Sequence, residues 1–551
     1  MRLSRAARAL ALAATLPFSL APRVATAQSD TWALTNARIQ TVTKGVIEKG
    51  TIIVRKGLIE AVGPNLTIPQ DARVLDLAGK TVSPGLIDLT SSLGLPTQAA
   101  PTGGNFGGGG GGAQTQGGPR GIEAERDAAR DLKVTPGDVK PIRDAGVTAV
   151  LVAPARGLFR GTSALVPLRD SVDATAVVRD PVAMHIGYQG VQGDYPATLL
   201  GVITYQRQAL YDAQRQALLL DRFRTNPRGM VRPENDARVD ALVPVVKGEL
   251  PAFIEANNEN EIRRAVRLAR EFNLKIAVVG ATEGWLALDA LAGKPVVVSM
   301  NFPQPTQVTR WSYRMSIRRA PNDSAAAARQ VQKLVEGNAA ALNQAGIRFA
   351  IASGGSREFV PNVRKAIAAG LPANVALEAV TIRAAELAGA GEVLGSIEAG
   401  KIANLVVTNG DILSDSAKVN TVFVDGIRYD GPPASAARPN PAGGNGSGGA
   451  AAQIGGSWGM TLNSPQGPLD ITMTVNQSGA TFSGNMTSMM GTQTIDEGQV
   501  TGRNVSWSMT MQVGGQSITI QYRGQVEGNR MTGSAELGSF GSATFTAEKK
   551  P

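Results

Sequence analysis

The chain has 551 residues, a single histidine, no cysteine and a formal net charge of +10. This length exceeds what one hydrophobic core normally serves, so the sequence predicts two or three domains. The absence of cysteine excludes disulfides and lipid attachment through a thiol. The basic residues are spread along the chain without a recognition motif, which argues against a nucleic-acid-binding protein.

The first 27 residues have the features of a secretory signal peptide. A basic start is followed by an apolar run over residues 9–21 and by an Ala-X-Ala site that ends at Ala27. The run is too short for a membrane-spanning helix and contains Pro17. We therefore expect cleavage after Ala27, a periplasmic or secreted bacterial protein, and no transmembrane segment in the mature chain.

Short β-strand patterns at residues 28–80 and 391–430 enclose a long region in which strands and helices alternate. Within residues 81–390, apolar runs of strand length are separated by amphipathic helical patterns, as expected for β/α repeats. The predicted strands cover residues 148–153, 252–254, 275–279, 294–298 and 348–352, and the clearest predicted helices cover residues 259–272 and 324–345. The region has the length of a (β/α)8 barrel.

Two tracts have compositions typical of segments without regular structure. Residues 103–118 follow the first barrel strand and include six consecutive glycines. This insertion is either a lid over the barrel or a loop without binding groups, and glycine runs favour the second interpretation. Residues 431–452 are rich in Pro, Ala, Gly and Ser, which is typical of an interdomain linker.

Residues 453–551 form a separate predicted domain. Apolar and polar residues alternate with period two, and glycines punctuate each run, which predicts a small antiparallel β-barrel or sandwich. Most of the chain's methionines lie here. Methionine fills irregular cores, so packing is the favoured interpretation, and an adaptable apolar ligand cavity is the alternative.

Three motifs connect the long region to a known family. Residues 84–88 read Pro-Gly-Leu-Ile-Asp, residues 144–148 read Asp-Ala-Gly-Val-Thr, and residues 395–401 read Gly-Ser-Ile-Glu-Ala-Gly-Lys. These motifs resemble the amidohydrolase superfamily, in particular its periplasmic, imidazolonepropionase-like members. The resemblance implies an amidohydrolase-like TIM barrel over residues 81–390, flanked by a small β-sandwich that is built from residues 28–80 and 391–430.

The metal-binding residues of that superfamily are replaced in this sequence. In the superfamily, the first motif leads into His-X-His, further histidines come from the fifth and sixth strands, and an aspartate comes from the eighth. The corresponding positions here are Thr90, Ser92, Glu255, Gly280 and Gly354. Hydroxyl groups are poor zinc ligands, and glycine has no side chain. The resemblance therefore implies a degenerate metal site with no expected cofactor, or at most a divalent metal in a non-standard, oxygen-rich site.

Four titratable residues are candidates for a remaining active site: Asp88, Glu255, Glu283 and His185. Asp88 also occurs in superfamily members that keep their ligands, so a structural role is its alternative. Glu255 is the best candidate for a functional carboxylate, and its alternative is a strand-end group bonded to backbone or arginine. His185 lies among apolar neighbours, which favours a core residue over a catalyst.

A basic and aromatic cluster follows the predicted seventh strand and is the candidate ligand-binding site. Its members are Arg310, Trp311, Tyr313 and Arg314. Guanidinium groups bind carboxylates and other anions in bidentate geometry. The alternative interpretation is a solvated helix or loop face.

Three functions are compatible with these patterns. The favoured one is a non-hydrolytic or strongly altered member that binds a small molecule or a partner protein, for example an active amidohydrolase paralogue. The second is an active hydrolase of C–N bonds in cyclic amides or dipeptide-like substrates, with a carboxylate-based metal site. The third is a ligand-binding module in the C-terminal β domain. If the first holds, Thr90→His and Ser92→His alone are not expected to create tight zinc binding.

Overall fold

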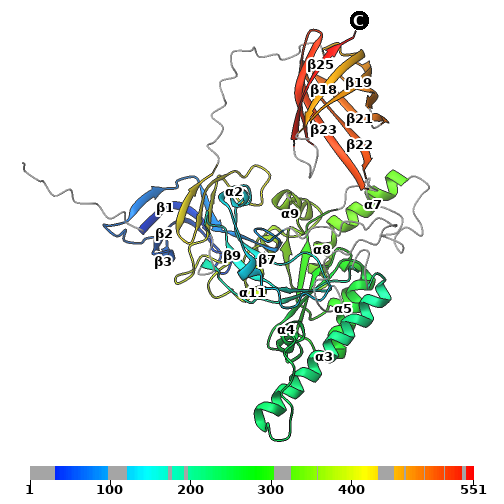
Figure 1. The fold of residues 1–551 in the computed structure, drawn as a ribbon. Helices are drawn as coiled ribbons and strands as arrows, with labels where there is room; N and C mark the ends of the chain where they lie inside the picture. Colours follow the sequence, from blue (N-terminus) through cyan, green and yellow to red (C-terminus); the bar gives the residue numbers. More distant parts are fainter. Residues whose placement is uncertain are drawn as a thin grey trace, which may run out of the picture. The chain divides into compact units, whose positions relative to one another are not determined.

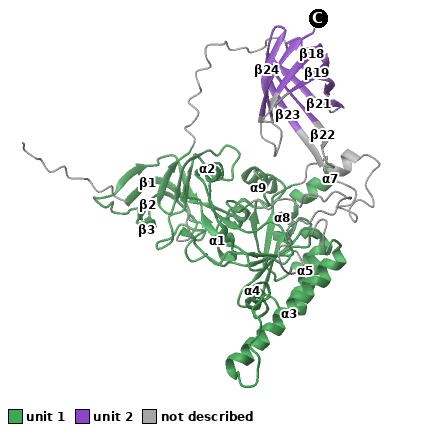
Figure 2. Cartoon of the chain, in the orientation of Figure 1, with its two compact units in different colours: residues 1–435 green, residues 436–551 purple. Residues whose placement is uncertain are grey.

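The computed structural model describes residues 31–96, 121–171, 176–190, 196–302, 324–356, 358–431, 452–464, 467–488, 491–513, 516–536 and 542–550. The chain forms two compact units, Met1–Ser435 and Ala436–Pro551 (Figure 2). The predicted signal peptide, the glycine-rich tract and most of the predicted linker lie outside the described residues, as does the cluster of Arg310, Trp311, Tyr313 and Arg314.

One sheet joins the two ends of the first unit. Its strands are β1 (Thr31–Gln40), β2 (Val46–Arg55), β3 (Leu58–Gly63), β4 (Arg73–Asp76), β5 (Thr81–Pro84), β15 (Leu405–Thr408), β16 (Val419–Val424) and β17 (Ile427–Asp430). The order is β17-β16-β15-β5-β1-β2-β3, with β4 beside β1. Antiparallel pairing of β5 with β15 brings Pro84 opposite Leu405. The ends of the region therefore fold together, as predicted, and lead directly into the first barrel strand.

A ring of strands forms the centre of the first unit (Figure 1). They are β6 (Leu86–Ser91), β7 (Val147–Val152), β8 (Phe159–Thr162), β9 (Ala164–Pro167), β10 (Met184–Ile186), β11 (Ala252–Ala256), β12 (Ile276–Gly280), β13 (Val296–Ser299) and β14 (Phe349–Ala352). Strands β10 to β14 pair in parallel, β6 pairs with β7 in parallel, and β14 contacts β6. The predicted α/β barrel is thus confirmed.

One position in the ring differs from the prediction. Residues 159–167 were not predicted as a strand, and they run antiparallel to their neighbours. Their first half, β8, pairs with β10, and their second half, β9, pairs with β7. The start of β8 therefore lies beside the end of β10, at the rim where the parallel strands have their carboxyl ends. We call this the carboxyl-terminal rim.

Helices surround the ring. They are α1 (Ala128–Asp131), α2 (Pro136–Asp144), α3 (Leu199–Thr225), α4 (Ala237–Val246), α5 (Glu259–Phe272), α6 (Leu288–Leu291), α7 (Ser324–Glu336), α8 (Asn338–Gln344), α9 (Phe359–Ala368), α10 (Ala373–Ala379) and α11 (Ile382–Leu387), with a 3-10 turn, η2, at Gly284–Leu286. The predicted helix over residues 324–345 is two helices separated by Gly337. No helix in the described ranges is both long enough and apolar enough to cross a membrane.

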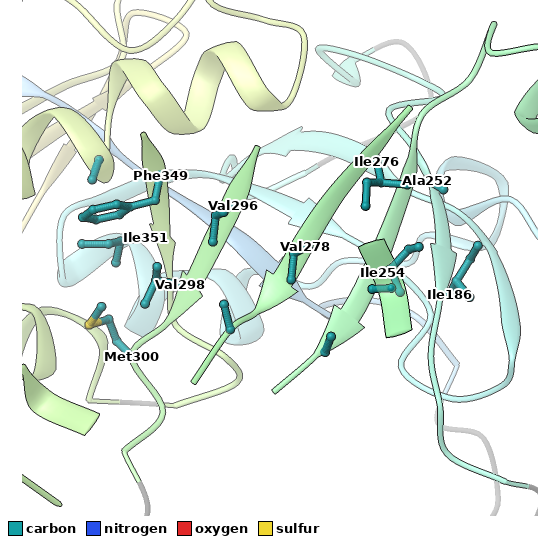
Figure 3. Packing of buried hydrophobic residues seen from close by; sticks show 14 of the residues in the cluster. Ile186, Ala252, Ile254, Ile276, Val278, Val296, Val298, Met300, Phe349 and Ile351 are labelled. Atoms are coloured by element: carbon teal, nitrogen blue, oxygen red, sulfur yellow. The ribbon is translucent and has the colours of Figure 1, made fainter. Parts of the chain in front are cut away.

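Alternate side chains of the parallel strands belong to two different apolar clusters. One cluster contains Ile254, Val278 and Val298 together with residues of α5, so it lies between strands and helices (Figure 3). The other contains Phe253 and Val279 and therefore faces the inside of the barrel. Side chains two residues before or after Phe253 on its strand, and those paired with it on neighbouring strands, face inward as well. These inward-facing positions determine which polar groups reach the carboxyl-terminal rim.

The second unit is a closed antiparallel β-barrel. Its strands are β18 (Gly456–Ser464), β19 (Gly467–Ser478), β20 (Thr481–Ser488), β21 (Gly491–Thr501), β22 (Asn504–Val513), β23 (Gln516–Glu527), β24 (Arg530–Glu536) and β25 (Ser542–Lys549). Trp507 and Tyr522 stack in the interior with ring centroids 4.8 Å apart. Five methionines are buried in the same core: Met460, Met473, Met486, Met509 and Met531. The predicted antiparallel β domain is therefore a barrel with a filled interior.

Candidate functional site

Asp88 and Thr90 join the first barrel strand to the last. One carboxylate oxygen of Asp88 accepts hydrogen bonds from the backbone N–H groups of Ser353 (2.8 Å) and Thr90 (3.1 Å). The Thr90 hydroxyl oxygen accepts a hydrogen bond from the backbone N–H of Gly354 at 2.7 Å. Burial raises the pKa of Asp88, although its hydrogen bonds to Ser353 and Thr90 oppose that shift. Both residues fasten β6 to β14, while Ser92 lies exposed in the turn after β6.

The predicted eighth-strand ligand position is filled by a neighbouring side chain. Gly354 has a φ of 63°, and a Cβ atom at this residue would overlap the Ser299 hydroxyl at the end of β13. The Asn301 amide donates a hydrogen bond to the Gly354 carbonyl at 3.1 Å. An aspartate at position 354 would therefore have to displace Ser299.

Glu255 forms an ion pair with an arginine that sequence reasoning missed. Arg160, the second residue of β8, places Nη1 2.7 Å from Oε2 of Glu255. The Arg160 side chain is only 7% exposed, and its Nε donates to the Gly157 carbonyl at 3.1 Å. A Cβ atom at Gly187 would overlap the guanidinium group, so glycine is needed beside it. A cation from the chain itself is thus bound to the carboxylate at the fifth-strand position.

The predicted sixth-strand position is also filled. Gly280 has a φ of 98°, and a Cβ atom there would overlap Oδ1 of Asn257. The Asn257 amide donates to Oε1 of Glu255 at 3.2 Å, and Oδ1 accepts from the Thr282 hydroxyl at 3.0 Å. A side chain at position 280 would therefore have to displace Asn257. Arg160, Glu255, Asn257 and Thr282 form one connected polar chain, which we call the rim network.

Glu283 stabilises the start of a helix. Its Oε2 accepts a hydrogen bond from the backbone N–H of Glu259, the first residue of α5, at 3.0 Å. A carboxylate at a helix N-terminus is favourable because the unpaired N–H groups carry partial positive charge. Burial raises the pKa of Glu283, and the nearby carboxylates of Glu259 and Glu261 add to the shift. The contact explains Glu283 as a helix-capping residue.

His185 faces the barrel interior, in step with Phe253. The two rings lie with centroids 5.5 Å apart, and the imidazole is 8% exposed. Burial, and secondly the positive charge of Arg160, lower the pKa of His185 to about 3. Among the described residues, no hydrogen-bond partner contacts its Nε2 atom. A neutral imidazole that is packed on Phe253 fits the core role favoured by the sequence.

These side chains do not form a ligand set for a divalent metal. In the described part of the chain, no three His, Asp, Glu or Cys side chains come together as a possible metal site. Of the predicted candidates, the structure connects Glu255 to Arg160, Asp88 to Thr90, and Glu283 to α5. The Glu255 carboxylate already contacts Arg160 through Oε2 and Asn257 through Oε1, so a metal ion at this carboxylate would compete with both contacts.

The comparisons with known proteins agree with the fold. The amidohydrolase family model matches residues 302–428. This part of the chain is therefore similar to the amidohydrolase family domain. A solved amidohydrolase structure from Thermotoga maritima MSB8 is similar with a TM-score of 0.59 and 21% identity, over 73% of this chain and 100% of that one. At that identity the likeness supports the fold alone.

A short segment is similar to curated enzymes. Imidazolonepropionases from three strains of Vibrio cholerae serotype O1 are 40% identical to the chain over 65 residues, which is 11% of this chain and 16% of each enzyme. The match spans about one sixth of the length of these relatives. It extends the amidohydrolase likeness without covering a complete enzyme.

Two residues of the rim network, Arg160 and Asn257, were not predicted from the sequence. Arg160 lies inside β8, a strand that the sequence did not predict, whereas the functional residues of parallel barrels usually follow their strands. Asn257 was overlooked because an amide is not a typical zinc ligand. One signal was available: Phe159-Arg160-Gly161 places an arginine inside an apolar stretch, and a buried arginine needs an acidic partner.

Proposed function

We propose that this chain is an exported, non-hydrolytic member of the amidohydrolase superfamily that acts by binding a small molecule or a partner protein. The observation that supports this proposal is the Arg160–Glu255 ion pair at 2.7 Å. In a metal-dependent hydrolase, the cation at this rim activates water and stabilises negative charge. Here the carboxylate at the fifth-strand position is neutralised by a guanidinium instead, and glycines with filled surroundings replace two further ligands.

The first test is metal stoichiometry. The mature protein would be produced in a bacterial periplasm, purified without chelators and analysed by elemental mass spectrometry. The proposal predicts folded protein with substoichiometric transition metal and no hydrolysis of cyclic amides or dipeptides. The variant Thr90→His/Ser92→His serves as control and should not take up zinc tightly, because Ser299 and Asn257 fill the other positions. One or two bound metal ions per wild-type chain would overturn the proposal.

The alternative is an active hydrolase with a carboxylate-based metal site. Its candidates remain Glu255, Glu283, Asp88 and His185, and its substrates would be cyclic amides, in line with the name of the short imidazolonepropionase match. This function requires Glu255 to leave Arg160. It predicts metal-dependent hydrolysis that is abolished by Glu255→Gln and retained in Asp425→Asn, a carboxylate variant in the flanking sheet region.

A surface groove favours the C-terminal β-barrel as a binding module. The groove has a volume of about 620 Å³ and crosses strands β21 to β24. Its lining includes the exposed side chains of Asn504, Ser506, Arg523 and Gln525. Amides, hydroxyls and one guanidinium suit a polar ligand that offers both donors and acceptors. Binding that Arg523→Ala weakens, while Arg160→Met leaves it unchanged, would assign ligand recognition to this unit.

A further inference from the structure

The groove on the C-terminal barrel is built from two rows of side chains that cross strands β21 to β24. These strands lie side by side in the second unit (Figure 2), and their outward-facing residues line up across the sheet. The first row is Thr501, Asn504, Gln525 and Thr532, and the second row is Gln499, Ser506, Arg523 and Ser534. All eight residues are exposed and line the groove of about 620 Å³. We call them the two polar rows.

Backbone forms the floor between the two polar rows. The residues between the rows pair across the same strands and are Val500, Val505, Gly524 and Gly533. Both valines belong to the barrel core, because successive side chains of a strand point to opposite faces. A Cβ atom at Gly533 would overlap the Arg523 carbonyl oxygen, so the sheet leaves no room for a side chain there. The groove is therefore built into the sheet itself.

Seven of the eight side chains in the two polar rows are uncharged amides and hydroxyls, and the eighth is Arg523. Amides and hydroxyls can donate and accept hydrogen bonds, and the hydroxyl groups of a sugar can do the same. Arg523 Nη2 lies 3.5 Å from Oε1 of Gln521, and no carboxylate pairs with this guanidinium among the described residues. None of the described lining residues is Asp or Glu. The lining therefore favours a neutral ligand with many hydroxyl groups over a cation, and one guanidinium is too few for a polyanion.

The dimensions of the groove suit an extended ligand. Neighbouring strands are about 4.8 Å apart, so the four side chains of each row span about 14 Å, and the two rows are about 7 Å apart. One exposed hydrogen bond gains little over water, so binding here requires many contacts at once.

A peptide fits this groove less well than a sugar chain. The barrel is closed, so strands β21 to β24 offer no free edge to which a peptide strand could pair. Among the described lining residues, Val505 carries the one apolar side chain, and it is buried in the core. The groove therefore has no apolar subsite for the side chains of a peptide.

We propose that a neutral oligosaccharide binds in this groove, across strands β21 to β24, and contacts both polar rows. The amides of Asn504 and Gln525 can each donate to one sugar hydroxyl and accept from its neighbour, and Arg523 donates to further sugar oxygens. This inference rests on the proposal that the C-terminal β-barrel is a binding module, and it names the class of ligand.

Isothermal titration calorimetry of the full mature chain tests the proposal. The probes are the neutral sugars maltotetraose, cellotetraose and chitotetraose, with tetragalacturonate as a charged comparison. At least one neutral sugar should bind with a Kd of roughly 0.01 to 5 mM. Asn504→Ala and Gln525→Ala should each weaken that binding by about fivefold, the effect of one lost hydrogen bond. Asn476→Ala is the matched control, because Asn476 is exposed on β19, outside the groove, and this variant should bind like the wild type.

Three results would overturn the proposal. The first is no binding of any neutral sugar at about 10 mM. The second is equal binding by Asn504→Ala, Gln525→Ala and the Asn476→Ala control. The third is tighter binding of tetragalacturonate that depends on Arg523 and not on Asn504, which would make the groove an anion site. Each of these results leaves the non-hydrolytic function of the first unit standing, since metal content and hydrolysis test that function separately.

Discussion

At the scale of single residues, the deciding feature is a buried guanidinium at the carboxyl-terminal rim of the barrel. Arg160 is almost fully buried and contacts Glu255, whose side chain is 34% exposed. Removing one member of such a pair leaves the other without its partner, and this usually costs more than the pair contributes. The rim network therefore holds Arg160 and Glu255 in a fixed arrangement at the carboxyl-terminal rim.

Replacement of Arg160 by methionine tests this pair. Arg160→Met should lower the free energy of unfolding by about 2 kcal/mol, at the low end for a broken ion pair because water reaches Glu255. The double variant Arg160→Met/Glu255→Gln should recover part of the loss. Urea denaturation of the wild type, both single variants and the double variant gives the coupling energy. Strict additivity of the two single effects would show that the groups do not interact.

His185 gives a pH prediction with a defined sign. Its pKa is about 3 in the folded chain and 6.5 in a solvated one. Between these pH values the unfolded chain binds a proton at His185 and the folded chain does not. His185 therefore contributes stability above pH 6.5 and loses about 1.4 kcal/mol of it for each pH unit below that value.

The pH profile of His185→Leu, subtracted from that of the wild type, should isolate this slope, because the chain has no other histidine. Proton NMR of the single imidazole measures the pKa of His185 in the folded protein directly. If His185 of the folded protein titrates near pH 6.5, burial does not lower its pKa and the prediction is wrong.

At the scale of elements, the sequence predicted the regular parts well. Continuous apolar runs identified β11 to β14, and the helical period identified α5 to the residue. The structure adds a capping box, formed by Asn258 and Glu261, at the start of this helix. The antiparallel stretch over residues 159–167 was missed. Gly161 and Ser163 interrupt its apolar pattern, and β/α repeats lead one to expect parallel strands joined by helices.

The candidate site, like the antiparallel stretch, could be predicted only in part from the sequence. Sequence comparison identified Gly280 and Gly354 as replaced ligands, but it could not show that Asn257 and Ser299 fill the space. Which side chain fills the space beside a glycine depends on the neighbouring strand, since Ala256 on β11 lies opposite Gly280 on β12. A side chain that follows one strand can therefore cover the end of the next.

Gly280→Ala should destabilise the protein through this overlap. Gly293→Ala is the matched control, because Gly293 also has a positive φ, 68°, but no atoms lie where its Cβ would be placed. We expect about 1 kcal/mol of backbone strain at Gly293 and about 3 kcal/mol in total at Gly280. Thermal unfolding measures both. Equal losses would mean that Asn257 moves aside freely.

At the scale of the whole molecule, the two units have separate hydrophobic cores. The core of the second unit includes Trp458, Trp507 and Phe545, and no residue of the first unit belongs to it. Each unit should therefore unfold in its own cooperative transition. Trp507→Ala should shift only the transition of the β-barrel, by about 3–5 kcal/mol, and Phe349→Ala only the other. Calorimetry combined with tryptophan fluorescence distinguishes the unfolding transitions of the two units. A single shared transition would contradict the prediction that the units unfold independently.

The hydrogen bonds that join Asp88 and Thr90 to the backbone of Ser353 and Gly354 should determine where the barrel opens first. In the described chain, β6 and β14 share no backbone ladder, and the bonds that close the ring join residues 263 to 265 positions apart. Closing so long a loop is entropically costly, while the side-chain bonds at this joint are few. The ring of strands should therefore open between β6 and β14 before the hydrogen-bonded strand pairs separate elsewhere. Amide protons of Ser353 and Gly354 should consequently exchange with deuterium sooner than those of β11 and β12.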